Sequence, residues 1–167
     1  MPNTNDNLQA AFAGESQANR KYLAFAVQAA KDGKPNVARL FRAAAEAETI
    51  HAHTHLRNLG AVKATPDNLR VAIAGETHEA TEMYPAMVKQ AEADGNKAVA
   101  KSFDLALRAE ARHARLYREA LDSLEAGRDL EKADVYLCPV CGNLVLGAPQ
   151  AACEICGAPA EKFIAIT

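Results

Sequence analysis

The chain has 167 residues, a formal net charge of -2 and 49% apolar residues, which is an ordinary balance for a globular protein. Its charge gives no basic surface for nucleic acid, and no apolar run approaches the roughly 20 residues that span a bilayer. Residues 1–9 are polar and lack the apolar core of a secretory signal. We therefore expect a cytoplasmic protein without nucleic-acid or membrane partners.

Four segments repeat apolar side chains at helical spacing, which predicts four long helices. They begin near Leu8 and near residue 67, and cover about 36–58 and 97–124. Glycine-containing breaks separate them, and Pro85 lies inside the third, where we expect a bend or a local defect.

The two helix pairs form an internal repeat. Ala13-Gly14-Glu15-Ser16 corresponds to Ala74-Gly75-Glu76-Thr77 at an offset of 61 positions. Asp32-Gly33 corresponds to Asp94-Gly95 at an offset of 62, as Glu48-x-x-His51 does to Glu110-x-x-His113. A single insertion therefore separates the two copies.

Candidate metal ligands recur with this repeat. A carboxylate and an imidazole three residues apart lie on one face of a helix and can bind one metal. Glu15 and Glu76 each interrupt an otherwise apolar stripe, where an unpaired carboxylate would be costly to bury. One Glu-x-x-His motif alone is compatible with a solvated helix face. The doubled set matches the ligands of a di-iron carboxylate four-helix bundle, so a pair of non-haem irons is predicted.

Glu79 follows Glu76 by three residues on the same face, and the first half has Ala18 at the corresponding position. We interpret Glu79 as a further ligand; the alternative is an exposed glutamate in a helix ion pair. His53, His55 and His78 are interpreted as non-ligands. The basic side chains on the outer helix faces, including Arg108, Arg112 and Arg115, are expected to be solvated.

The C-terminal segment carries two CxxCG motifs, Cys138-Pro-Val-Cys141-Gly142 and Cys153-Glu-Ile-Cys156-Gly157. Eleven residues separate them, which is typical of a four-cysteine metal site. Spacing does not separate iron from zinc, but an electron-transferring iron suits a neighbouring di-iron centre. A charged linker over 125–133 predicts a bundle domain at 1–130 and a cysteine domain at 131–167, with a strand near Phe163–Ile166.

Together these motifs resemble rubrerythrin, in order and over nearly the whole chain. The resemblance implies a ferritin-like all-α four-helix bundle, a small β/loop rubredoxin-like domain, a di-iron centre and an Fe(Cys)4 site. It also implies an NAD(P)H-linked peroxidase of oxidative-stress defence that reduces hydrogen peroxide to water. Electrons would come from a reductase or rubredoxin through the rubredoxin-like site, and the family is typically a homodimer.

The resemblance also implies a role for each matching residue. Glu48 and Glu110 match bridging carboxylates, whereas Glu15, Glu76 and His113 match terminal ligands. Glu79 and His51 match the two ligands that exchange at one iron on reduction. Four cysteines match the ligands of the relay iron: Cys138, Cys141, Cys153 and Cys156.

Tyr22 and Tyr84 match the family's tyrosines near the ligands, although core packing is the default interpretation of both. The small domain departs from the pattern at Asn143-Leu144-Val145, where an aromatic residue is usual, and at Glu154, where a proline is usual. These departures leave the four cysteine ligands in place. They bear on the reduction potential of the cysteine site and on which electron donor docks there.

Two other functions fit part of the pattern. A ferroxidase or iron-storage protein explains the helices but leaves the cysteines and Glu79 without a role. A zinc-ribbon adaptor explains the cysteines but leaves the buried carboxylates and imidazoles unexplained.

Overall fold

The computed structural model describes residues 3–131 and 134–166. Its contacts divide the chain into two units, residues 1–63 and 64–167. The first unit contains α1 (Thr4–Lys31) and α2 (Pro35–Asn58). The helical part of the second unit consists of α3 (Thr65–His78), the π-helical turn η1 (Glu79–Met83), α4 (Tyr84–Ala93) and α5 (Lys97–Glu125).

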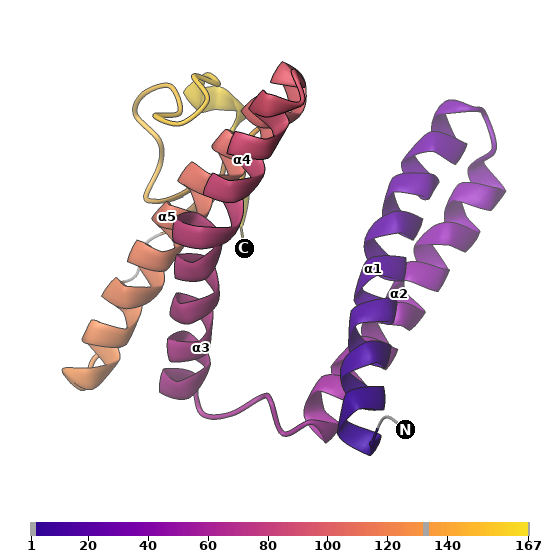
Figure 1. The fold of residues 1–167 in the computed structure, drawn as a ribbon, viewed down its shortest axis with the longest axis horizontal. Coiled ribbons are helices and arrows are strands. Elements are labelled where there is room, and N and C mark those ends of the chain that lie inside the picture. The colour runs from indigo at the N-terminus through magenta and orange to yellow at the C-terminus, as the bar shows by residue number, and fades with distance from the viewer. Residues whose placement is uncertain (1–2, 132–133, 167) are drawn as a thin grey trace. The chain divides into compact units, whose positions relative to one another are not determined.

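The first unit is a helical hairpin (Figure 1). Asn3 caps α1 through a capping box, in which its side chain accepts from the Asp6 N–H and the Asp6 carboxylate accepts from the Asn3 N–H, both at 3.0 Å. Gly33 adopts a φ of 68° in the turn, which a side chain would strain. Buried alanines line the contact, which lets the helices approach closely; they are Ala26, Ala29, Ala38, Ala45 and Ala52.

The second unit repeats this hairpin with one extra residue. Buried Ala29 and Ala38 correspond to buried Ala91 and Ala100 at an offset of 62, whereas Glu15 and Glu76 are 61 apart. The extra residue therefore lies between Glu76 and Ala91, and η1 absorbs it as a π-helical turn. The local defect expected near Pro85 is present, since the π-helical turn η1 ends directly before α4. Pro85 lies in the first turn of α4, where its missing N–H is tolerated.

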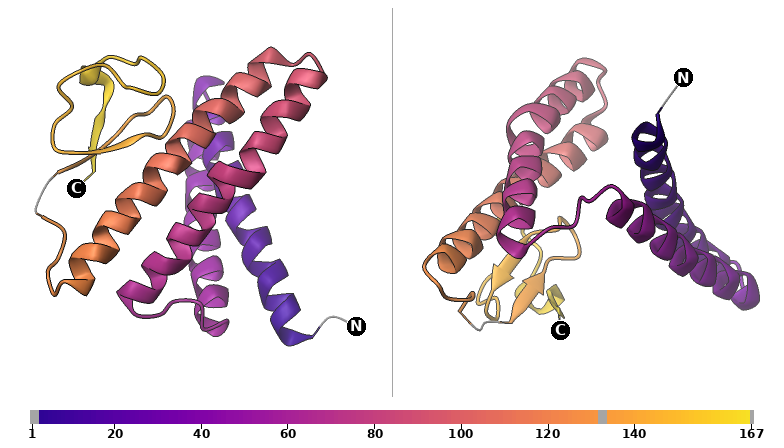
Figure 2. Two further views of the ribbon diagram at one scale, coloured as in Figure 1. Left: turned by 60° about the vertical axis from the view of Figure 1, so that its left-hand side comes forward. Right: turned by 90° about the horizontal axis from the view of Figure 1, so that it is seen from below.

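The cysteine region forms a three-stranded antiparallel sheet in the order β2-β1-β3 (Figure 2). Its strands are β1 (Val135–Leu137), β2 (Leu144–Leu146) and β3 (Ile164–Ile166), and the short 3-10 helix η2 (Ala160–Lys162) precedes β3. Buried Cys138 and Cys153 cluster with Ala109 of α5, which ties this region to the helices of its unit. The predicted strand at the C-terminal end is confirmed by β3, and residues 132–133 of the predicted linker lie outside the described residues.

These elements confirm the predicted fold class, namely long helices followed by a small cysteine-bearing β region. None of the helices in the described part of the chain is both long and apolar enough to cross a membrane.

Close helix contact at Ala45 is the basis of a first prediction. Ala45 is fully buried between α1 and α2. Ala45→Leu should therefore reduce the unfolding free energy by about 1–3 kcal/mol, because the added atoms force the helices apart. Urea denaturation followed by circular dichroism measures the change. Ala43→Leu on the exposed side of α2 is the control, and equal effects of the two variants would contradict close packing at Ala45.

Candidate metal centres

The first unit brings Glu15 of α1 together with Glu48 and His51 of α2. One ligand atom of each residue lies within 4.8 Å of those of the other two. His51 Nδ1 lies 3.0 Å from Glu48 Oε2, as the three-residue spacing predicts. The His51 side chain is 55% exposed in this unit, so its ring has space to change position.

The second unit brings together Glu76 of α3 with Glu110 and His113 of α5, again with one ligand atom each within 4.8 Å of one another. His113 Nδ1 lies 2.7 Å from Glu110 Oε2 and 3.7 Å from Glu76 Oε2. The His113 side chain is only 17% exposed, so this imidazole is held more firmly than that of His51.

A backbone carbonyl fixes the proton of His113. The Nε2 atom lies 2.9 Å from the carbonyl oxygen of Gly142, which can only accept, so Nε2 donates. In the neutral ring Nδ1 then presents a lone pair toward the Glu110 and Glu76 carboxylates. Acceptors that face one another require a cation between them, either a proton or a metal. This donor set therefore fits a divalent metal, held with its imidazole oriented from behind by Gly142.

The charges around Glu76 show how crowded this cluster is. Burial, a hydrogen bond with Glu110 and repulsion by the Glu110 charge raise the pKa of Glu76 from 4.5 to about 7. Burial and the charges of Glu110, Glu79 and Glu76 raise the pKa of Tyr84, which therefore stays protonated at neutral pH. Burial and the charges of Glu76 and Glu110 likewise raise the pKa of Tyr117. Tyr117 was not predicted as a site residue, although it lies two turns after Glu110 on the same helix face.

Glu79 lies at the first position of η1 and is half-buried. Its charge raises the pKa of both Glu76 and Tyr84, so it lies near the second cluster without being one of its three closest members. Tyr22 packs against Phe25 and Phe41, with ring centroids 6.3 and 6.1 Å away.

The four cysteines form a third cluster, in which all four sulfur atoms lie within 4.8 Å of one another. Cys138 Sγ lies 3.6 Å from Cys156 Sγ, and Cys141 Sγ lies 3.6 Å from Cys153 Sγ. A tetrahedral site with metal–sulfur bonds of about 2.3 Å separates its sulfurs by about 3.8 Å, whereas a disulfide needs about 2 Å. The cluster therefore has the spacing of a metal site.

Each cysteine pair lies on a tight backbone turn. The Gly142 N–H donates to the Cys138 carbonyl at 3.0 Å, and the Gly157 N–H donates to the Cys153 carbonyl at 2.8 Å. Burial opposes ionisation of Cys153, but hydrogen bonds from the N–H groups of Cys156 and Ile155 and from the side chains of Cys141 and Cys156 lower its pKa to about 6. Burial raises the pKa of Cys141 and of Cys156, so without a metal the thiolate form is favoured at Cys153 and opposed at these two sulfurs.

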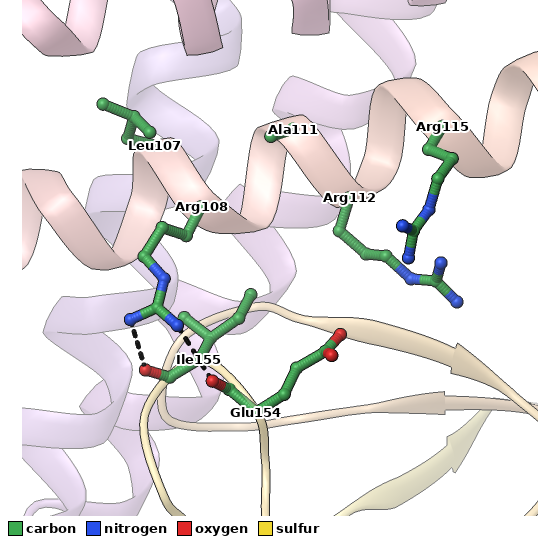
Figure 3. A pocket seen from close by; sticks show the side chains of 7 residues that line it. All are labelled: Leu107, Arg108, Ala111, Arg112, Arg115, Glu154 and Ile155. Atoms are coloured by element: carbon green, nitrogen blue, oxygen red, sulfur yellow. Dashed lines mark hydrogen bonds between the residues drawn. The ribbon is translucent and has the colours of Figure 1, made fainter.

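Arg108 and Arg112 attach the cysteine region to α5. Arg108 is exposed, as predicted for the outer face, but its guanidinium is bonded to backbone carbonyls, and Arg112 is half-buried. Arg108 Nη1 and Nη2 donate at 2.8 Å to the carbonyls of Ile155 and Glu154, between the third and fourth cysteines (Figure 3). Arg112 Nε donates to the Leu144 carbonyl at 3.3 Å. Arg108 and Arg112 line a cavity of about 320 Å³ beside α5, and Arg115 lines it as well.

Comparisons with known proteins cover most of the chain. A family model described as rubrerythrin matches residues 6–121. Rubrerythrin-2 of Clostridium acetobutylicum is 39% identical, with 96% of this chain and 95% of the relative covered. Nigerythrin of Nitratidesulfovibrio vulgaris is 35% identical, with 97% and 86% covered. A solved structure of fully reduced, all-ferrous nigerythrin matches with a TM-score of 0.60 at 33% identity, covering 99% of this chain and 88% of that one.

The raised pKa of Glu76 predicts how the metal-free protein responds to pH. The folded state holds this proton more tightly than the unfolded chain, so the unfolding free energy falls as pH rises from about 4.5 to about 7. Glu76→Gln removes that loss, so its stability relative to wild type should increase over the same interval. Urea denaturation of metal-free protein between about pH 5 and pH 8 measures this. Exposed Glu46→Gln is the control, and a difference for Glu76→Gln that stays constant with pH would contradict the assignment.

Proposed function

Because the chain belongs to the rubrerythrin family, we propose that it reduces hydrogen peroxide to water at a di-iron centre, with electrons relayed through the four-cysteine site. The observation that carries this proposal is the hydrogen bond from His113 Nε2 to the Gly142 carbonyl. It links a candidate iron ligand directly to the residue that follows Cys141. A storage protein has no need of such a link, and neither has a zinc-ribbon adaptor.

The proposed ligands of the two irons are Glu15, Glu48, His51, Glu76, Glu79, Glu110 and His113. Carboxylates and imidazoles suit iron that changes between ferrous and ferric states. When bound, two ferrous ions would supply the two electrons that hydrogen peroxide takes up, together with two protons, to give two water molecules. The all-ferrous state of the nigerythrin structure supports a centre that can be fully reduced.

The chain's own residues provide a hydrogen-bond donor and ligands that can change position. The raised pKa of Tyr84 keeps its phenol protonated beside Glu76, Glu79 and Glu110, where it can donate a hydrogen bond to bound peroxide. Packing against Phe25 and Phe41 holds Tyr22, for which the same role is proposed. The exposed ring of His51 and the position of Glu79 at a π-helical turn suit ligands that exchange during the reaction.

The remaining parts of the proposal concern partners and setting. Cys138, Cys141, Cys153 and Cys156 would hold the relay iron, with zinc as the rival metal. The donor would be a rubredoxin or an NAD(P)H-linked reductase, and the protein would act as a cytoplasmic homodimer in defence against oxidative stress. Metal analysis combined with the visible spectrum tests the relay, because ferric iron bound by thiolates is red and zinc is colourless.

Glu79→Ala tests the proposed ligand exchange. Loss of this carboxylate should slow peroxide turnover about 10–100-fold while the helices stay folded. Stopped-flow re-oxidation of reduced protein by peroxide measures the rate, and circular dichroism checks the fold. Glu82→Ala is the matched control, because Glu82 lies on the same π-helical turn and forms an exposed pair with His78. Turnover of Glu79→Ala at the wild-type rate would refute the ligand role.

Cys153→Ser tests the relay. Turnover driven by a reductase should be abolished, whereas chemically pre-reduced protein should still consume one round of peroxide. Re-oxidation of reduced wild-type protein by peroxide should also be much faster than by air. Oxidation by air at least as fast as by peroxide would favour a ferroxidase, and normal reductase-driven turnover in Cys153→Ser would remove the cysteine site from the electron path.

A further inference from the structure

Asn143 is a polar side chain buried among the cysteines. It is 1% exposed and follows Gly142 directly. Its carbonyl accepts from the Cys138 N–H at 2.8 Å, and its side-chain Nδ2 lies 3.7 Å from Cys153 Sγ. The large radius of sulfur makes this a hydrogen-bond distance. Asn143 therefore contacts both halves of the cluster, through its backbone on one side and its amide on the other.

Only one orientation of this amide suits a thiolate. With Nδ2 toward Cys153, an N–H donor meets a sulfur acceptor. With the amide reversed, oxygen would face sulfur and two acceptors would repel each other. The observed orientation leaves Asn143 Oδ1 buried without a hydrogen-bond partner among the described residues. An orphaned buried carbonyl costs about 1–3 kcal/mol, so an apolar side chain of the same size would serve stability better.

We propose that Asn143 raises the reduction potential of the four-cysteine iron site by donating an N–H···S hydrogen bond to Cys153. This inference rests on the proposed function for the presence of iron. Reduction adds one electron from the donor and breaks no bond, so the iron–thiolate unit becomes more negative by one charge. A donor aimed at a ligand sulfur stabilises the more negative form, which makes the site easier to reduce. Asn143 is thus a positioning residue that sets how readily the relay accepts an electron.

Asn143→Leu in the full-length, iron-loaded protein is the test. Leucine keeps the volume and removes the N–H donor, so the ferrous-to-ferric ratio at a fixed potential should fall about tenfold. This corresponds to about 59 mV for one electron. Bleaching of the ferric–thiolate absorption during a mediated dithionite titration gives the midpoint potential. Asn143→Met removes the donor with different packing and should lower the potential by a similar amount.

Gln150→Leu is the matched control. Gln150 lines the same cavity as Asn143, of about 290 Å³, but donates to the Ala148 carbonyl and not to a sulfur. Its substitution should leave the potential unchanged. An unchanged or raised potential in both Asn143 variants would overturn the role of Asn143 while leaving iron in the site. A wild-type cysteine site that takes up zinc and refuses iron would instead overturn the proposed function, so the two failures are distinct.

Discussion

Repulsion between hydrogen-bond acceptors is the constraint on which the second unit's site depends. Glu76 and Glu110 lie so close that burial and their mutual interaction raise the pKa of Glu76 to about 7. His113 cannot relieve this crowding in its neutral form, because its only N–H is bonded to Gly142. A proton can neutralise one carboxylate, but a divalent metal neutralises both and uses the imidazole lone pair as well. Apolar residues at these positions would pack without such repulsion. Carboxylates held this close together despite their repulsion are typical of a functional site.

The cysteine site meets the opposite requirement, because four sulfurs close to one another need donors around them. The backbone N–H of Asn143 donates to Cys141, those of Ile155 and Cys156 donate to Cys153, and the Asn143 side chain adds a further N–H. Arg108 reinforces the second turn from outside by binding two of its carbonyls. Since α5 carries both Arg108 and His113, one rigid helix positions the cysteine turns and a candidate iron ligand together.

Short-range patterns made most of the fold predictable. The helix boundaries, the Glu-x-x-His pairs and the CxxCG turns follow from spacings of a few residues, and the structure agrees with them. The roles of Arg108 and Arg112 were not predictable, because their partners are backbone carbonyls 32 to 47 positions later in the chain. An arginine on the outer face of a helix looks the same in sequence whether it meets water or a folded turn. The bond between His113 and Gly142 was hidden for the same reason.

Two differences between the halves give the repeat its chemical asymmetry, namely Glu79 at the position of Ala18 and the one-residue insertion. Without Glu79, each half would offer one lone glutamate and one Glu-x-x-His motif, and the two ligand sets would be equivalent. The inserted residue is absorbed by η1, and Glu79 occupies the start of that turn where the first half has only Ala18. π-helical turns inside α-helices are frequent at functional sites. The extra charge near Glu76 therefore lies at the start of the local change in helix geometry that the insertion causes. Sequence alone shows that there is an insertion, but only the structure shows that the turn Glu79–Met83 absorbs it.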